Sequence, residues 1–276
     1  MAADRSLVNA VTPLNDDILV VREKSKHVDV YDSYSHRLLR RVLIKELQDA
    51  TDMASSARHR CVYIADYKGK VVFRLTPDTW QLSKWTVSDG PFGLSVTSNH
   101  NVLVTCPDTR RLKEFTTDGR LVREIVLERN ITSRVWHAVE LSPGQFAVGY
   151  GGYDDSVHKV CVVNALGQIG SCYGGLKGVK VGQLELPVHL TIADGSVLVA
   201  CLKRRQVIQL SPTMNYVGTV LSDLEGPFTM HYDEELSRLY VADNTYNRLT
   251  DSWHSGGVKL FDINLKPTDI PRPTVA

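Results

Sequence analysis

The sequence has no excess charge of either sign. Its 276 residues carry 32 lysines and arginines against 31 aspartates and glutamates, which gives a formal net charge of +1. This balance excludes a globally basic nucleic-acid binder and an acidic tail protein. A function that depends on charge therefore requires that charges are segregated on the folded surface.

Long apolar runs and paired cysteine motifs are also missing. No window approaches the roughly 18 apolar residues that span a bilayer, and the first ten residues, MAADRSLVNA, lack a basic segment followed by an apolar one. The five cysteines are odd in number and form no Cys-x-x-Cys pair, which argues against a disulfide framework and a zinc ribbon. We therefore expect a cytoplasmic protein in a reducing compartment, with no membrane segment.

The chain does contain a repeat. Apolar runs of four to six residues, rich in Val, Ile, Leu and Tyr, alternate with clusters of turn-forming residues along the whole chain, which is typical of short strands. Gly90–Leu127 begins GPFGLSV and Gly226–Ile263 begins GPFTMHY, and fainter copies lie around them. The residues that end the second strand of each copy recur every 40 to 52 positions, at Arg22, Asp66, Cys106, Gly149, Cys201 and Asp243.

Each copy contains four expected strands, named A to D in chain order. A four-stranded sheet with two apolar faces cannot bury both faces alone, so neighbouring sheets must pack around a common axis. We predict a single all-β domain over 1–276, a six-bladed β-propeller with about 44 residues per blade. Prolines at 267, 271 and 273 indicate that the sixth blade is incomplete. The predicted repeats are 6–46, 47–89, 90–133, 134–183, 184–224 and 225–276.

Two kinds of segment resemble NHL repeats. LYVADNTYNR at Leu239–Arg248 and VYIADYKGKVVFRL at Val62–Leu75 resemble the second-to-third-strand signature of that family, and TTDGRLVREI resembles its third-to-fourth-strand pattern. The resemblance covers about residues 6–263. It implies a propeller of NHL type, similar to the NHL domains of TRIM-NHL proteins, which bind single-stranded RNA on the face that carries the B to C loops.

Cations gather in the loops that join strands B and C, which share one face of the predicted propeller with the D to A loops. A ring of cations would neutralise phosphates, and neighbouring aromatic side chains would stack on bases. We therefore predict a non-catalytic module that binds single-stranded RNA there. The predicted binding residues are Lys68, Lys70, Phe92, Arg110, Arg111, Lys113, Trp136, Tyr153, Lys203, Arg204, Arg205, Phe228, Tyr246 and Arg248.

Two other interpretations of this face stay open. The D to A loops add carboxylates to it, among them Asp49, Asp89 and Glu225, so the cations also fit an ordinary solvated surface. Loops of propellers serve protein partners as readily as nucleic acids. The first alternative function is therefore a protein-binding or substrate-recruiting propeller of a TRIM-like protein. We expect a monomer.

A metal-dependent enzyme is the second alternative. His137 and His189 align at the same level of neighbouring inner strands, and two imidazoles facing one channel are weak candidates for zinc ligands. The resemblance also implies this class, because propellers of NHL-like design include metal-dependent hydrolases and a peptide-amidating lyase. No third ligand is evident from the sequence, and hydrogen-bonded core histidines are more common than two-ligand sites. We predict no metal, no cofactor and no catalysis.

Overall fold

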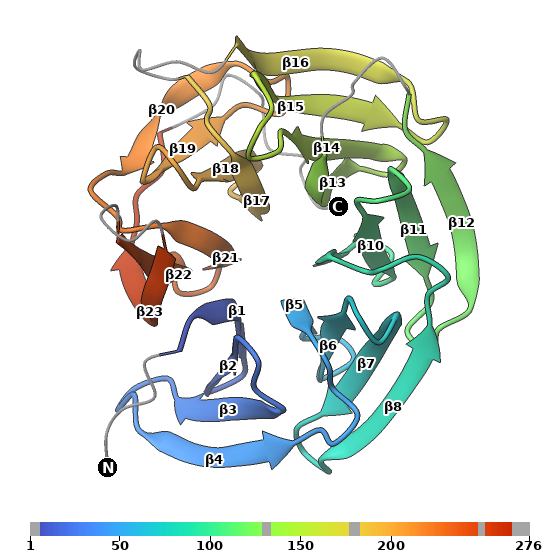
Figure 1. The fold of residues 1–276 in the computed structure, drawn as a ribbon, viewed down its shortest axis with the longest axis vertical. Helices are drawn as coiled ribbons and strands as arrows, with labels where there is room; N and C mark the ends of the chain where they lie inside the picture. The colour runs from blue at the N-terminus through green and yellow to red at the C-terminus, as the bar shows by residue number, and fades with distance from the viewer. Residues whose placement is uncertain (1–5, 129–133, 177–182, 248–251, 267–276) are drawn as a thin grey trace.

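The computed structural model contains six antiparallel sheets arranged around a central axis (Figure 1). It describes residues 6–128, 134–176, 183–247 and 252–266. Within these ranges the regular secondary structure consists of strands alone, and no helix is long and apolar enough to cross a membrane. The predicted all-β, six-bladed propeller is confirmed.

Each sheet is one blade, built from consecutive strands whose first member lies nearest the axis. Blades one to three consist of β1 (Val8–Leu14), β2 (Asp17–Arg22), β3 (His27–Asp32), β4 (Leu38–Leu43), β5 (Ala50–Ser56), β6 (Cys61–Asp66), β7 (Val71–Thr76), β8 (Gln81–Thr86), β9 (Gly93–Val96), β10 (Val102–Cys106), β11 (Arg111–Phe115) and β12 (Leu121–Val126). Blades four to six consist of β13 (Val135–Ser142), β14 (Gln145–Tyr150), β15 (Val157–Asn164), β16 (Ile169–Leu176), β17 (Pro187–Ala193), β18 (Ser196–Cys201), β19 (Gln206–Leu210), β20 (Tyr216–Leu221), β21 (Pro227–Asp233), β22 (Arg238–Asn247) and β23 (Ser252–Asp262).

The apolar core lies between blades rather than on the axis. The second strands β6, β10 and β18 are buried at every position because a neighbouring blade covers each of their two faces. The outer strands β4 and β8 are mostly exposed. In the described part of the chain, buried side chains form one cluster at each of the six blade interfaces. Burial of each Val or Leu side chain contributes about 1.5–3 kcal/mol, so the interfaces supply the main stabilisation.

In blades two and six, an Asp of the second strand ties the blade's entry loop to that strand. The Asp66 carboxylate at the end of β6 accepts the backbone N–H groups of Gln48 and Asp49, both at 2.9 Å. Asp243 does the same for Glu225 and Gly226, at 3.0 and 2.7 Å. These bonds fix the loop that leads into the inner strand, which explains why the motif recurs at the same place in two blades.

Among the described residues, the sheet of the sixth blade contains no strand from the first blade. It has three strands among the described residues, and the prolines predicted to interrupt its edge lie outside them. The inner strand β1 packs against β21 and β22, with Val8 and Val11 of the first blade meeting Tyr240 and Ala242 of the sixth. Each described blade is thus formed by one continuous segment of chain.

The cysteine count and spacing indicated no disulfide, whereas the structure contains one. Cys161 and Cys172 lie opposite each other in β15 and β16 and form a disulfide. The odd count and the 11-residue separation gave no sign of the pair, because the hairpin register alone brings the two Cα atoms within 4.1 Å. Cys61, Cys106 and Cys201 are free and buried among apolar side chains.

Candidate functional site

Aromatic side chains from four blades meet at one mouth of the central channel. Tyr67 belongs to the β6–β7 loop, Phe92 precedes β9, Tyr153 belongs to the β14–β15 loop and Phe228 lies in β21. Together they line a cavity of about 330 Å³. Its remaining lining residues are Leu7, Asn9, Glu23, Asp49, Thr51 and Asn244. Phe92, Tyr153 and Phe228, which the sequence places on the face of the B to C loops, thus line one cavity.

Three of these rings and Trp136 form a continuous row, which we call the aromatic arc (Tyr67, Phe92, Trp136 and Tyr153). Neighbouring ring centroids are 6.3, 5.1 and 6.1 Å apart along the row, and each pair meets edge to face. Trp136 is only 4% exposed and its indole N–H donates to the Gly151 carbonyl. Trp136 is therefore a buried member of the arc and not the open stacking surface that the sequence predicts, whereas the Tyr153 side chain is 44% exposed.

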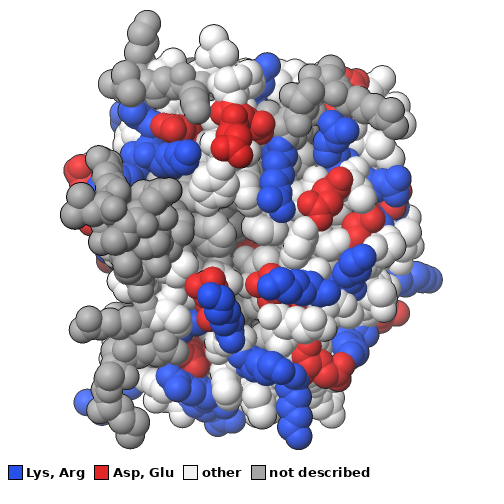
Figure 2. Space-filling view, in the orientation of Figure 1, with Lys and Arg blue, Asp and Glu red and all other residues white. Residues whose placement is uncertain are grey.

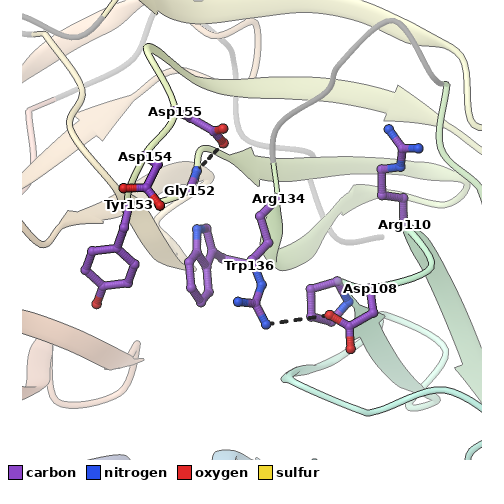
Figure 3. Close-up of a pocket in the computed structure, with 9 residues that line it drawn as sticks. Asp108, Arg110, Arg134, Trp136, Gly152, Tyr153, Asp154 and Asp155 are labelled. Atoms are coloured by element: carbon purple, nitrogen blue, oxygen red, sulfur yellow. Dashed lines mark hydrogen bonds and ion pairs between the residues drawn. The ribbon is translucent and has the colours of Figure 1, made fainter.

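A second, larger pocket adjoins the arc (Figure 3). It has a volume of about 640 Å³ and shares Trp136 and Tyr153 with the arc. The Arg134 guanidinium lies 4.8 Å from the Trp136 ring centre and 3.7 Å from an Asp108 carboxylate oxygen. Figure 3 shows the Arg110 side chain pointing away from Trp136. The pocket's other lining residues are Pro107, Gly152, Asp154 and Asp155.

Sequence reasoning missed Arg134. It occupies the D to A connection in front of β13, whereas the predicted cations all belong to B to C loops. Its position two residues before Trp136 was the available signal, since both side chains then leave an extended backbone on the same side.

Four predicted RNA-binding cations are paired with carboxylates. Lys113 lies within β11 rather than in a loop, and its buried Nζ is 2.7 Å from Asp89 and 3.2 Å from Glu124. Arg111 begins the same strand and lies 2.8 Å from Glu124. Two further pairs are Lys68 with Asp49 at 3.4 Å and Arg205 with Glu225 at 2.9 Å.

Positive and negative side chains are interspersed on the face seen in Figure 2. The acids of the D to A loops account for three of the pairs just described, through Asp49, Asp89 and Glu225. A continuous ring of cations is therefore not what these loops present, because each acid neutralises a neighbour within ion-pair distance.

The other predicted residues have varied surroundings. The Lys203 Nζ lies 5.4 Å from the centre of the Tyr153 ring. Lys70 is exposed in the β6–β7 loop, and Arg110 and Arg204 are partly buried. The side chain of Tyr246 and the whole of Arg248 lie outside the described residues.

The two histidines lie deeper in the channel, where the structure adds a third group. The rings of His137 in β13 and His189 in β17 stack with centroids 3.8 Å apart. Both Nε2 atoms face the buried carboxylate of Asp52 in β5, at 3.3 and 3.5 Å. These three ligand-type atoms lie within 4.8 Å of one another, so the described residues contain a potential metal-binding cluster that the sequence did not reveal.

Hydrogen bonds at the other ring nitrogens decide what this cluster can do. The backbone N–H groups of Leu190 and Met230 point at Nδ1 of His137 and His189, both at 3.4 Å. Nδ1 must therefore accept, which leaves the proton of each neutral imidazole on Nε2. The His137 Nε2 accordingly donates to the Leu94 carbonyl at 2.9 Å. A nitrogen that carries a proton offers no lone pair to a metal. The arrangement therefore favours a hydrogen-bond network that links neighbouring blades over a metal centre.

The electrostatics of the cluster agree with that arrangement. Burial lowers the pKa of His189 to about 4, with His137 acting in the same direction and Asp52 opposing both. Burial alone would raise the pKa of Asp52, but the imidazoles' hydrogen bonds and charges hold it well below its usual range. Backbone N–H groups of Met53 and Leu94 also donate to this carboxylate, both at 2.8 Å. The site thus holds an ionised Asp52 beside a neutral His189 at neutral pH.

The class of protein that this fold defines is the six-bladed β-propeller, and solved structures of other propellers are similar to it. The WD40 repeats of RRP9 match with a TM-score of 0.66 at 12% identity, covering 95% of this chain and 96% of that one. U3-55K matches at 0.65 and 12%, over 95% and 97%. Virginiamycin B lyase from Staphylococcus aureus matches at 0.63 and 12%, over 96% and 87%. These identities show the fold alone. No protein-family model and no curated protein match the sequence.

Proposed function

We propose that this chain is a non-catalytic binding module that holds a segment of a partner protein against the aromatic arc. One observation carries the proposal: four blades each contribute an aromatic ring to a single cavity at the channel mouth. Aromatic side chains supply large contact areas at small entropic cost, and they dominate the energetics of protein interfaces.

The charges beside the arc favour a protein over a polyanion. The larger pocket is lined by Asp108, Asp154 and Asp155 against Arg110 and Arg134, so acids outnumber bases there. A phosphate backbone binds through unpaired cations that release its counterions. A protein segment, in contrast, can match alternating charges with side chains of both signs.

Single-stranded RNA is the second candidate, and a specific observation favours it. Two cations already lie over exposed or partly exposed rings of the arc: Lys203 over Tyr153, and Arg134 over Phe92 at 5.8 Å. Cations beside stacking platforms are the arrangement that single-stranded nucleic acids require. Under this alternative the chain would be an NHL-type propeller, a type that the sequence signature around Asp66 and Asp243 resembles. It would then work in the cytoplasm.

A catalytic role is the least supported alternative. It would use Asp52, His137 and His189, whose hydrogen bonds place protons on the Nε2 atoms that a metal would need. The similar structures include a lyase, virginiamycin B lyase, but only the fold connects it with this chain. We therefore assign these three residues to holding blades two, four and five together.

Two libraries screened in parallel test the proposal. The full chain is panned against a random peptide display library and against a random single-stranded RNA pool, at about 0.15 M salt. We expect enriched peptides whose affinity falls roughly tenfold or more with Phe92→Leu or Tyr153→Ala, since truncation of an anchoring aromatic typically costs that much. Tyr34→Ala, at an 81% exposed ring in the β3–β4 turn, is the matched control.

The outcome separates the candidates. Enriched RNA without enriched peptides would replace the protein ligand by the second candidate. Enrichment of neither class, or peptides that ignore both arc substitutions, would overturn the proposal.

A further inference from the structure

We propose that the cavity at the channel mouth recognises a positively charged side chain, a lysine or arginine of the bound protein segment. The proposal rests on the proposed function and adds the chemistry of the anchor. We call the group that would hold it the cation cage: Tyr67, Phe92, Tyr153, Phe228, Glu23 and Asp49.

The rings of the cage supply the first part of the attraction. The face of an aromatic ring is electronegative, so it attracts an ammonium or guanidinium group placed within about 6 Å of its centre. This molecule already uses its rings in that way. Arg134 lies over Phe92 at 5.8 Å, and Lys203 lies over Tyr153 at 5.4 Å.

The charges of the lining supply the second part. Its ten residues include two carboxylates, Glu23 and Asp49, and no lysine or arginine. Each carboxylate is near a lysine of its own loop or blade: Glu23 lies 3.4 Å from Lys24 and Asp49 lies 3.4 Å from Lys68. The two lysine side chains are 86% and 67% exposed. Such exposed pairs are weak, so a guest cation held between rings can replace either lysine.

The polar neighbours and the size fit a single side chain. Asn9 also lines the cavity, and its Nδ2 already donates to the Ala50 carbonyl, so its Oδ1 is oriented by that bond. A volume of about 330 Å³ lies at the small end of the roughly 300–1,000 Å³ found for small-molecule sites. Such a space is large enough to accommodate one alkylammonium or guanidinium group with its stem.

This lining separates a cationic guest from an anionic one. The cavity wall itself carries two carboxylates and no lysine or arginine, so it offers a phosphate no direct cationic contact and favours a cationic guest. A neutral apolar guest would contact the same rings but would gain nothing from the carboxylates. The cage therefore predicts that a cationic guest binds more tightly than a neutral guest of the same shape, and this difference in affinity can be measured.

A pair of isosteric probes tests the cage on the intact chain. Choline and 3,3-dimethyl-1-butanol have the same shape and differ in the charge of the central atom. Each is titrated into isotopically labelled protein and followed by amide chemical shifts around Phe92 and Asp49. We expect choline to bind at least about fivefold more tightly than the alcohol, as the ring and carboxylate attraction predicts.

Substitutions then connect the preference to the cage. Phe228→Leu and Asp49→Asn should each weaken choline binding by roughly two- to fivefold and leave the alcohol unaffected. The controls are Tyr34→Leu and Asp78→Asn, at exposed residues of the β3–β4 and β7–β8 turns. Equal binding of both probes, or binding of neither up to about 50 mM, would overturn the cage, and this comparison needs no variant to fold.

The peptides obtained from the display library distinguish failure of the cage from failure of the proposed function. Replacement of their lysines by norleucine removes the ammonium group and keeps the four-carbon stem, and replacement of their arginines by citrulline removes the charge and keeps the planar head group. Peptides that bind equally well after both replacements would overturn the cage while the binding module stands. A choline preference without any enriched peptide would leave the cage intact and remove the protein ligand.

Discussion

The side-chain amide of Asn244 in β22 pairs with the backbone of Val8 in β1, 236 positions away. Its Nδ2 donates to the Val8 carbonyl and its Oδ1 accepts the Val8 N–H, both at 2.9 Å. Gly256 in β23 makes the approach possible, since a Cβ there would overlap the Asn244 Oδ1 and lie 2.5 Å from the Val8 nitrogen. Because the described blades exchange no strand, this buried pair is a polar contact that joins the first blade to the last.

Breaking this contact should destabilise the whole ring. Asn244→Ala leaves the buried N–H and C=O of Val8 unpaired, and we expect a loss of about 2–4 kcal/mol in the free energy of unfolding. Gly256→Ala forces the strands apart and should cost about 1–3 kcal/mol. Urea unfolding measures both.

The neighbouring glycine is the control. A Cβ at Gly257 would meet nothing within 4 Å, so Gly257→Ala should change the free energy of unfolding by less than about 0.5 kcal/mol. If Gly256→Ala and Gly257→Ala changed the free energy of unfolding equally, the contact between Asn244 and Val8 would not be what holds the ring closed.

The fold followed from the sequence because its determinants are local. Alternating apolar runs, the spacing of the copies and the Asp66 and Asp243 signatures each act within one blade, and the hydrogen bonds of these carboxylates explain their recurrence. The contact between Asn244 and Val8 could not be predicted in this way, since it depends on how 236 intervening residues turn around the axis.

The same limit applies to the candidate site. Phe92, Tyr153 and Phe228 were predicted from their places at the strand ends, and the structure brings them to one cavity. Asp52 was missed because its inner strand, β5, contains no proline or histidine by which it could be aligned with the inner strands of the other blades. Lys113 was predicted to lie in a loop, but it is the third residue of β11, where successive side chains alternate between the two faces of the sheet.

Stability should fall on mild acidification. The pKa of His189 is about 4 in the folded chain, against about 6.5 for an unperturbed histidine, so the unfolded chain takes up a proton first as the pH falls. The contribution is complete above about pH 6.5 and is lost progressively down to about pH 4, up to about 3 kcal/mol. Asp52, whose pKa is also lowered, adds a further loss below its ordinary value.

Urea unfolding at several pH values between 7.5 and 4.5 measures this dependence. His189→Gln should make the decline in that range shallower without abolishing it, because burial also lowers the pKa of His231 to about 4 and that histidine keeps its own share of the pH dependence. His36→Gln, at an exposed histidine, should leave the slope unchanged. A slope that is the same in both variants would contradict the assignment.

Chelation should leave the protein unaffected. The Nε2 proton of His137 is donated to the Leu94 carbonyl, so removal of metal ions should shift the thermal midpoint by less than about 1 °C. Thermal unfolding before and after dialysis against EDTA checks this, together with elemental analysis of protein prepared without chelator. Stoichiometric zinc or calcium that disappears in the double variant His137→Ala and His189→Ala would establish a metal centre and the enzyme class instead.

Substitution of Lys113 should lower the stability of the fold, whereas substitution of Lys203 should not. Lys113→Met leaves Asp89 and Glu124 without their shared cation, and we expect a loss of about 2–3 kcal/mol, below the 3–5 of a fully buried pair because Glu124 is 30% exposed and keeps Arg111. Lys203→Ala, at an exposed lysine beside Tyr153, should change the free energy of unfolding by less than about 0.5 kcal/mol.

The salt dependence of RNA binding should show the opposite pattern, with an effect at Lys203 and none at Lys113. Removal of the Lys203, Arg204 and Arg205 side chains together should weaken any RNA complex and flatten its salt dependence by about 0.7 for each phosphate that is no longer neutralised. Lys113→Met should leave the salt slope unchanged in the fraction that remains folded. Both readouts come from titrations of one fluorescent single-stranded RNA at a series of salt concentrations. A salt slope that falls with Lys113→Met and not with the triple variant would mean that the ion pair with Asp89 opens in the complex and that the basic face is larger than the structure shows.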